Sequence, residues 1–456
     1  TLGGTLFPYT TLFRSPELEL ALYKLYQYTG NNQYLEFMKY ILMERGKQPS
    51  FLLKDTGYGE QYHDKWFALE YHQAHKPILE QTEAVGHAVR AMYLYSGMAD
   101  LAKTLDDETL FKTLKVLWAD VTTKKMYITG AIGSDEHGEG FSIAYDLPND
   151  RAYAETCASI GLFMWARRML KLELNSDYAD VMELALYNGI SSGMSEDGKQ
   201  YFYVNPLEVN PAKVHQRYDL KHVRSSRVTW FGCACCPPNV ARILTSLEKY
   251  SYDISDDSNS IAIHLYLCGQ IIMSDDSVWN ITGKYLTDGK IEITYSGEEK
   301  DFTLRLRNPG WSTACEIRIN GLRIKAESEQ GYFYILRKWK NGDTVQLKFG
   351  ITAQLVYANT YVEDDAGKVA VMRGPVVFCL EEADNGKNLS ELMIGTIESH
   401  CENSVILNGY REHTMDSIAL YSTNPPSIEE TTIKAIPYSH WGNTGEGEMK
   451  VWVRKV

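Results

Sequence analysis

Residues 81–104 of the chain read QTEAVGHAVRAMYLYSGMADLAKT and have the spacing of an amphipathic helix. Apolar side chains recur on one side of this stretch, so we expect one helix over its whole length. The same period predicts further helices on both sides of it, over residues 16–30, 32–46, 107–123, 153–172, 177–189 and 238–252. Because loops without strand patterns separate these segments, we expect stacked helical hairpins.

At about residue 253 the pattern changes to period two. Apolar and polar residues alternate, and turn pairs such as Asn-Gly and Asp-Gly separate the runs, which is typical of a β-sandwich. A second β-rich stretch, also interpreted as a β-sandwich, runs from about residue 355 to the end. The sequence therefore predicts a multidomain α + β protein, with a helical domain over 16–252 and β-sandwich domains over 253–354 and 355–456.

Length and charge exclude several classes of protein. The 456 residues suggest about three domains and can bury a large core without disulfide bonds. Lys and Arg number 46 against 59 Asp and Glu, a net charge of −13 without a long basic run, so we expect no nucleic-acid partner. No apolar stretch approaches the roughly 20 residues needed to span a bilayer, so we expect no membrane partner either.

The first residues of the chain stand apart from the rest. Residues 1–15 (TLGGTLFPYTTLFRS) carry no pattern that joins to the following helix, and they resemble a translated sequencing adapter. We interpret them as a non-native segment. No signal peptide is visible, and free thiols favour a reducing cytoplasm as the location of the protein.

Cysteines and a glutamate form the strongest chemical motif in the sequence. Three thiols crowd into Cys233-Ala-Cys235-Cys236, and Glu155-Thr-Cys157 adds a carboxylate and a fourth thiol. Adjacent cysteines rarely pair with each other, whereas Zn²⁺ favours four ligands and prefers thiolates. Glu155 and Cys157 are two residues apart, so we expect them at a helix entry, and Cys235-Cys236 precedes a helix that starts with proline. The alternative is a cluster of buried free thiols. The four remaining cysteines lie singly in β regions and are expected in the core: Cys268, Cys315, Cys379 and Cys401.

Two other segments contain residues capable of chemistry. Residues 129–141 are rich in glycine and contain Glu139, and glycines let the backbone approach a ligand, although composition alone favours a solvated turn. Glu83 and His87 are expected on one helix face at spacing i and i+4. The alternative for His87 is a hydrogen-bonded core histidine.

Together these motifs resemble glycoside hydrolase family 127, the β-L-arabinofuranosidase family. The resemblance runs from Pro16 to the C-terminus and includes the closing Trp441-Gly-Asn and Met449-Lys-Val-Trp452. The motifs that carry it are the stretch from Gln81 to Ala91, the loop from Gly133 to Glu139, Tyr153-Ala-Glu155-Thr-Cys157-Ala, and Cys235-Cys236-Pro-Pro-Asn239.

The resemblance implies a fold and an activity. The fold is an (α/α)₆ barrel followed by β-sandwich domains, and the activity is that of a zinc-dependent, retaining exo-glycosidase that hydrolyses terminal β-L-arabinofuranosides of plant glycans. Zn²⁺ is the implied cofactor and an arabinofuranosyl glycan the implied partner, with a homodimer left open. The implied zinc ligands are Glu155, Cys157, Cys235 and Cys236.

The resemblance also implies roles in the reaction. Cys235 is the implied nucleophile, Glu139 the implied general acid/base, and His87 and Tyr203 the implied sugar contacts. A free thiol with a pKa of about 8.5 is mostly protonated at neutral pH, whereas a zinc-bound thiol is deprotonated. Partial desolvation of the loop is expected to raise the pKa of Glu139, which must protonate the leaving oxygen.

Two features depart from the family pattern. Cys233 adds a thiol beside the implied ligands, as a spare group or an alternative ligand. The predicted helices are fewer than the twelve of an (α/α)₆ barrel, so we expect the barrel to be incomplete at its N-terminus. Two alternatives stay open: a related glycosidase of different sugar specificity on the same fold, and a catalytically impaired, zinc-stabilised, carbohydrate-binding fragment.

Overall fold

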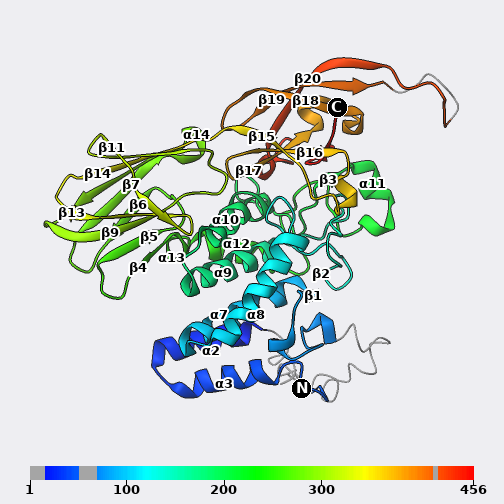
Figure 1. The fold of residues 1–456 in the computed structure, drawn as a ribbon. Helices are drawn as coiled ribbons and strands as arrows, with labels where there is room; N and C mark the ends of the chain where they lie inside the picture. Colours follow the sequence, from blue (N-terminus) through cyan, green and yellow to red (C-terminus); the bar gives the residue numbers. More distant parts are fainter. Residues whose placement is uncertain (1–15, 51–68, 414–419) are drawn as a thin grey trace.

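The computed structural model describes residues 16–50, 69–413 and 420–456 (Figure 1). The expected non-native segment, residues 1–15, lies outside the described residues. Helices occupy the middle and the bottom of the view, and two groups of strands occupy the left and the top. None of the described helices is both long enough and apolar enough to cross a lipid bilayer.

The helices pair along the chain as hairpins. α7 packs against α2, α8 and α9, while α9 packs against α10 and α12, and α3 packs against α2 and α7. This arrangement agrees with the predicted stack of helical hairpins. The bounds of these helices are α2 Glu17–Thr29, α3 Asn32–Glu44, α7 Ala88–Leu105, α8 Glu108–Asp120, α9 Thr156–Leu172, α10 Ser176–Leu184 and α12 Cys236–Leu244, and the short helices α11 Pro211–Gln216 and α13 Glu248–Ser251 also belong to this part.

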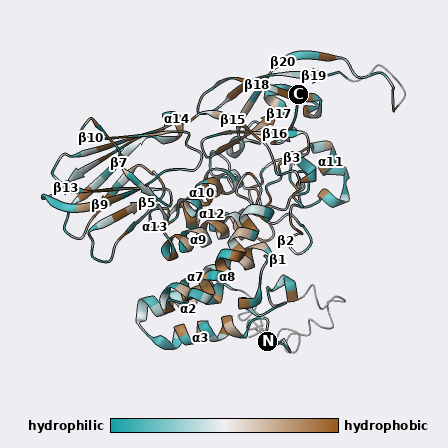
Figure 2. Ribbon diagram, viewed as in Figure 1, coloured by the Kyte–Doolittle hydropathy of each residue, from teal (hydrophilic) through white to brown (hydrophobic). Residues whose placement is uncertain are grey.

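α7 lies at the centre of the helical core. Every residue from Ala91 to Ala102 is buried, so this helix is covered on all sides rather than on the one side that its sequence indicated. α9 is buried over most of its length as well, whereas α2, α3 and α8 carry both apolar and polar residues (Figure 2). α7 and α9 approach closely at Gly161, where an added Cβ would lie 2.7 Å from the Cβ of Met92.

The expected helix over 81–104 begins seven residues later than predicted, at Ala88. Gly86–His87 instead forms a short strand, β1, that pairs antiparallel with β2, Gly140–Phe141. Gly86 has a φ of +68°, and a Cβ on it would lie 2.0 Å from the carbonyl oxygen of Glu70. The helix therefore does not extend back through Gly86, and the predicted helix face shared by Glu83 and His87 does not form.

The middle part is a β-sandwich, as the period-two pattern predicted. One sheet has the strand order β11-β10-β14-β8-β7-β6 and the other β12-β13-β9-β5-β4, and their facing side chains share one core. The strands are β4 Tyr252–Ile254, β5 Ser260–Ile263, β6 Gly269–Ile272, β7 Val278–Lys284, β8 Lys290–Ser296, β9 Lys300–Arg307, β10 Cys315–Ile319, β11 Leu322–Ile324, β12 Glu327–Glu329, β13 Tyr332–Trp339 and β14 Thr344–Phe349.

The C-terminal part differs from the predicted second sandwich. β16 pairs with β22 and also with β17, so the strands β16-β22-β18-β19-β20-β17 close into a ring around one apolar core rather than forming two facing sheets. The strands are β15 Ala353–Val356, β16 Lys368–Arg373, β17 Val376–Glu381, β18 Leu392–His400, β19 Val405–Glu412, β20 Ile428–Pro437, β21 Met449–Lys450 and β22 Val453–Lys455.

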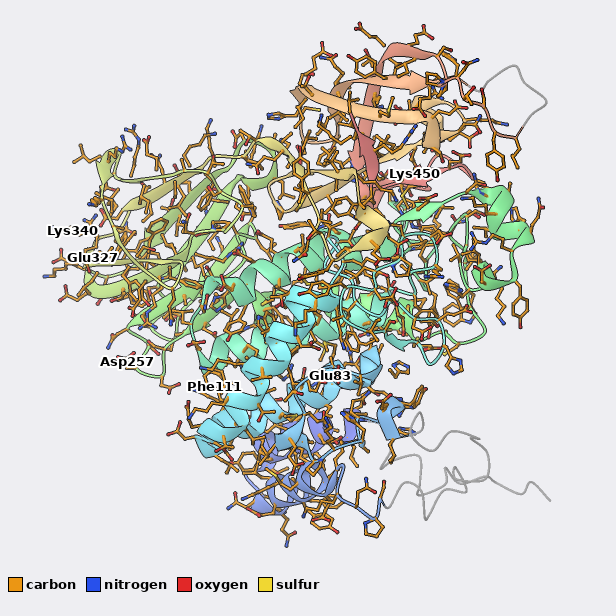
Figure 3. The ribbon with its side chains drawn as sticks, turned by 45° about the vertical axis from the view of Figure 1, so that its right-hand side comes forward. Glu83, Phe111, Asp257, Glu327, Lys340 and Lys450 are labelled. Carbon is orange, nitrogen blue, oxygen red and sulfur yellow. The ribbon has the colours of Figure 1, made fainter. Side chains whose placement is uncertain are left out.

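Polar contacts join both β parts to the helices. Arg307, from β9, is fully buried and pairs with Asp180 and Glu183 of α10. β21 pairs with β3, Glu208–Val209, which belongs to a long loop of the helical part, and the Nζ of Lys450 lies 2.9 Å from the Oε1 of Glu208. Figure 3 shows Lys450 at this junction. The loops of the helical part are therefore fixed from outside by the strands.

Candidate active site

A cleft with a volume of about 800 Å³ opens where the helices α7, α9 and α12 begin. Side chains from the helix starts and from the two long loops of the helical part line it. They include His87, Glu139, Tyr153, Glu155, Cys157, Tyr203, His222, Phe231, Cys233 and Cys235. The cleft therefore brings together residues from four separate parts of the sequence.

The predicted ligand set converges at the floor of this cleft. Glu155 is the N-cap of α9 and Cys157 lies in its first turn, while Cys235 and Cys236 form the start of α12. Both pairs lie at helix entries, as their sequence context predicted. The Sγ atoms of Cys157 and Cys236 are 3.5 Å apart, and those of Cys235 and Cys236 are 3.8 Å apart. The Oε1 of Glu155 lies 3.5 Å from the Sγ of Cys235 and 3.7 Å from that of Cys236.

These distances match the edges of a tetrahedral zinc site. With Zn–S near 2.3 Å and Zn–O near 2.1 Å, two sulfur ligands are about 3.8 Å apart, and a sulfur and an oxygen about 3.6 Å. The second carboxylate oxygen of Glu155, Oε2, is buried and has no hydrogen-bond partner among the described residues. One carboxylate and three thiols are also the donor types that Zn²⁺ prefers. The four residues therefore fit a zinc ion.

The acidic groups of the cluster suppress one another's ionisation. Burial, followed by the charge of the Cys235 thiolate, raises the pKa of Glu155. The hydrogen bond with Cys235 raises the pKa of Cys157, and the hydrogen bond with Cys157 raises that of Cys236. Hydrogen bonds from the two other thiols lower the pKa of Cys235. The protein alone thus favours one thiolate, at Cys235, and a cation would be needed to ionise the rest.

Glu139 and His87 form a pair above this cluster. The pairing of β1 with β2 sets His87 opposite Gly140, and the N–H of Ala88 donates to the carbonyl oxygen of Glu139 at 3.0 Å. The Nε2 of His87 then lies 3.2 Å from the Oε2 of Glu139. One oxygen of Glu139, one nitrogen of His87 and one oxygen of Glu155 all lie within 4.8 Å of one another. The structure thus brings Glu139 next to the cysteine cluster.

The pKa of Glu139 departs from the sequence-based expectation. The hydrogen bond from His87 lowers it and outweighs partial burial, which acts in the opposite direction. The hydroxyl of Tyr153 also bonds to Glu139 and lowers its pKa further. The prediction of a raised pKa is therefore wrong, because the donors around the carboxylate were not visible in the loop sequence.

Two tyrosines complete the wall of the cleft. The hydroxyl of Tyr203 lies 3.3 Å from the Sγ of Cys235, so this residue lies in the cleft beside the cluster, and its expected contact with the sugar stays a prediction. Tyr153 lies edge-on to Tyr203, with ring centroids 6.1 Å apart, and stacks on His222 at 5.8 Å. Tyr153 and His222 were not among the site residues predicted from the sequence. The available signals were the position of Tyr153 two residues before Glu155 and the length of the loop over 200–236.

The other cysteines are placed differently from one another. Cys233 is exposed and lines the cleft, but it does not belong to the group of four converging ligand atoms. Only Cys379 of the remaining four is buried, while Cys315 is partly exposed and Cys268 and Cys401 are exposed. The prediction that all four lie in the core is wrong for the exposed pair. Each of these two lies outside the regular strands, where alternation no longer dictates burial.

Comparisons with known proteins agree with this architecture. The family description "Beta-L-arabinofuranosidase, GH127 catalytic domain" matches residues 11–249, the GH127 middle domain matches 260–351, and the family 127 C-terminal domain matches 353–454. These matches define the chain as a glycoside hydrolase. A non-reducing end β-L-arabinofuranosidase of Bifidobacterium longum subsp. longum is 38% identical over 467 residues, covering 96% of this chain and 70% of the relative.

Solved structures give the same result. A GH127 β-L-arabinofuranosidase from Geobacillus stearothermophilus T6 is 44% identical, with a TM-score of 0.90, covering 96% of this chain and 72% of the other. A second GH127 β-arabinofuranosidase is 35% identical, with a TM-score of 0.83, covering 96% and 68% of the two chains. The chain belongs to glycoside hydrolase family 127.

Proposed function

We propose that the chain is a zinc-dependent, retaining exo-glycosidase that hydrolyses terminal β-L-arabinofuranosides. Cys235 is the nucleophile in this proposal, and Glu139 is the general acid/base. The observation that carries it is the position of Glu139, held by His87, within 4.8 Å of the Glu155 carboxylate, which itself lies 3.5 Å from the Sγ of Cys235. The sugar specificity in this proposal is based on the β-L-arabinofuranosidase activity for which the Bifidobacterium and Geobacillus relatives are named.

The same proposal includes the metal and the fold. Glu155, Cys157, Cys235 and Cys236 would hold the zinc ion, whose charge would keep the thiols deprotonated. The helix pairs α2–α3, α7–α8 and α9–α10 would belong to an (α/α)₆ barrel. We further propose the division into domains at residues 16–252, 253–354 and 355–456.

The residues of the chain then have distinct tasks in two steps. In the first, the Cys235 thiolate attacks the anomeric carbon while Glu139 donates a proton to the leaving oxygen. In the second, Glu139 removes a proton from water, which displaces the sulfur as a thiolate. His87 and Tyr203 would contact the sugar and hold these two groups in position.

The hydrogen bond from His87 favours the second of these tasks. It lowers the pKa of Glu139, which suits a base, whereas the first step needs the carboxyl protonated. A sugar that fills the cleft excludes water from Glu139, and desolvation raises the pKa of a carboxyl. Substrate binding would therefore favour the protonated form of Glu139, which acts as the acid. Departure of the leaving group would let water return and favour the ionised form, which acts as the base.

The assignment of the nucleophile is tested by substitution of Cys235. Cys235→Ala should abolish hydrolysis of an aryl β-L-arabinofuranoside, since it removes the sulfur that attacks the anomeric carbon. Cys268→Ala is the matched control, because Cys268 is exposed and lies outside the cleft, and it should retain full activity. Undiminished turnover by the Cys235 variant would refute the assignment.

One observation favours a non-catalytic alternative. The cluster offers four protein ligands, which is the closed pattern of structural zinc sites, whereas most catalytic zinc sites keep one position open. A zinc-stabilised, carbohydrate-binding fragment would show one bound zinc ion per chain and no turnover. A related glycosidase of different specificity would instead hydrolyse another member of a panel of aryl glycosides.

A further inference from the structure

A second cavity lies outside the catalytic cleft, at the junction of the helical part and the C-terminal strands. Its volume is about 210 Å³, below the roughly 300 to 1,000 Å³ of pockets that enclose drug-sized ligands, so it has room for about one ring. Members of the segments 122–128 and 145–147 line it from the helical part, and residues 356–359 with Val362 and Asp365 line it from the C-terminal part. Trp452 and Leu147 are buried and form part of its apolar base.

Tyr145 and Tyr357 line this cavity, and Tyr361 packs against Tyr145; we call these three residues the tyrosine platform. Tyr357 and Tyr361 expose 64% and 69% of their surface. The rings of Tyr145 and Tyr361 lie 5.1 Å apart, tilted by 41°. Single exposed aromatic residues are normal on a protein surface, but a group of three around a cavity is a feature of binding sites.

The backbone of Tyr145 has a strained conformation. Tyr145 has a φ of +67°, in the left-handed region that bulky residues rarely adopt. Its N–H donates to the carbonyl oxygen of Lys124 at 2.9 Å, which fixes the residue beside the cavity. Such strain persists where the surroundings impose it and is concentrated at functional sites.

The cavity also offers hydrogen-bond acceptors. Asp365 is buried at its wall, and its Oδ1 accepts from the Nδ2 of Asn149 at 2.7 Å. Its Oδ2 has no hydrogen-bond partner in the described part of the chain. Burial raises the pKa of Asp365 to about 6, so the carboxylate is mostly ionised and accepting at neutral pH. The neighbouring Glu363 and Asp364 add negative charge, which disfavours an anionic ligand.

From this geometry we propose that the tyrosine platform and its cavity bind one neutral sugar unit of a glycan, separately from the catalytic cleft. Apolar C–H faces of the sugar would stack on Tyr357 and Tyr361, and its hydroxyl groups would donate to Asp365. Tyr145 lies six residues after Glu139, on the loop that ends the β1–β2 pair. An extended glycan could thus be held by the same loop that carries the proposed acid/base.

Affinity electrophoresis in a gel that contains a soluble glycan with terminal β-L-arabinofuranosyl groups tests the proposal. The choice of this glycan rests on the proposed function. The glycan should slow the migration of the intact chain. In the double variant with Tyr357→Ala and Tyr361→Ala, this retardation should be several-fold smaller. Tyr40→Ala is the matched control, because Tyr40 is 62% exposed on α3 and should leave retardation unchanged. His87→Ala changes the cleft alone, and this variant should still be retarded.

Activity and oligomeric state separate the remaining outcomes. The double tyrosine variant should hydrolyse a small aryl β-L-arabinofuranoside at the rate of the intact chain, and the soluble glycan with terminal β-L-arabinofuranosyl groups several-fold more slowly. Absence of retardation of the intact chain, or full retardation of the double variant, would overturn the platform proposal. A dimer that becomes a monomer in the double variant would also overturn it, since the surface would then be an interface. Failure of aryl glycoside hydrolysis, with retardation that depends on the platform, would contradict the proposed catalytic function alone.

Discussion

The Nε2 of His87 lies 3.2 Å from the Oε2 of Glu139, although the two residues belong to distant parts of the sequence. The pairing of Gly86–His87 with Gly140–Phe141 produces this contact, and glycines on both strands make it sterically feasible. A Cβ on Gly140 would lie 2.5 Å from the carbonyl oxygen of Gly86. The contact holds the proposed acid/base beside the cysteine cluster, and several predictions depend on it.

Glu139→Gln should lower turnover on the order of 10² to 10⁴-fold for glycosides with poor leaving groups, because the amide cannot donate the required proton. Aryl glycosides with strongly acidic phenols need little protonation, so the first step with them should be affected far less. The measurement is turnover across a series of phenols of decreasing pKa. An equal loss across the whole series would contradict the role of Glu139 as the acid.

His87→Asn should lower kcat/KM by about tenfold or more, because loss of one hydrogen bond to a charged group costs about 1.5 to 3 kcal/mol. The control is His137→Gln, an exposed histidine on the same loop that does not line the cleft. Its kinetic constants should match those of the intact chain. Equal losses in both variants would point to a general disturbance of the loop rather than to the contact with Glu139.

Removal of a ligand should release the metal and destabilise the helical part. Cys157 is 3% exposed, and Cys157→Ser should reduce the zinc content measured by elemental analysis from one ion per chain to a small fraction. The melting temperature should fall with it, since metal bound only to the folded state adds stability. Cys315→Ser is the control outside the cluster, and it should keep its zinc. Full zinc content in the Cys157 variant would exclude this residue from the ligand set.

Gly161→Ala tests the close approach of α7 and α9. In a helix, alanine is favoured over glycine by about 1 kcal/mol, so propensity alone predicts a more stable protein. The new Cβ would lie 2.7 Å from the Cβ of Met92, and such overpacking typically costs about 1 to 3 kcal/mol. We therefore expect no gain or a net loss in denaturant unfolding. Gly269→Ala, with open space around the new Cβ, is the control.

His264 should make stability depend on pH in the mildly acidic range. It is fully buried in the β-sandwich, with its Nδ1 2.7 Å from the hydroxyl of Tyr332 and its Nε2 3.0 Å from the Oδ2 of Asp253. Burial lowers its pKa from 6.5 to about 4, and the nearby charges of Arg167 and Arg307 also lower it. The folded state thus binds fewer protons than the unfolded state between these two values.

The sign of the effect follows from this difference. The contribution of His264 is fully present above pH 6.5 and is lost as the pH falls toward 4, by about 3 kcal/mol in total. Asp253 has a lowered pKa and extends the loss to lower pH. Urea unfolding at a series of pH values should show this decline, and His264→Gln should flatten it between pH 6.5 and 4. An unchanged slope in the variant would contradict the assignment.

The ligand cluster could be predicted from the sequence because local order determines it. Glu155 and Cys157 lie two residues apart at the start of one helix, and Cys235 and Cys236 are adjacent at the start of another. Helix entries are marked by short-range signals, such as the prolines after Cys236. Only the meeting of the two helix starts required the fold, and the resemblance to the family supplied it.

Features that depend on distant pairings could not be predicted in this way. The hydrophobic spacing continues through residues 81–87 and indicates a helix. In the structure, Gly86–His87 pairs with β2 instead, and the helix begins only after this pair. Alternation in the C-terminal strands indicated two sheets, but closure of the ring depends on β16 pairing with both β22 and β17. An alternating pattern of apolar and polar residues indicates which face of a strand is buried, but it does not indicate which strand pairs with it. The lowered pKa of Glu139 has the same origin, since its donors come from other segments.

The central claim is that Cys235 becomes covalently attached to the sugar during the reaction. Rapid acid quenching during turnover of an aryl β-L-arabinofuranoside, followed by peptide mass spectrometry, tests this directly. The account predicts that the peptide containing Cys235 gains the mass of one anhydropentose on the sulfur, and that Glu139→Gln changes the amount of this adduct. An adduct on Glu139 or Glu155, or rapid turnover with no adduct on any cysteine, would contradict it.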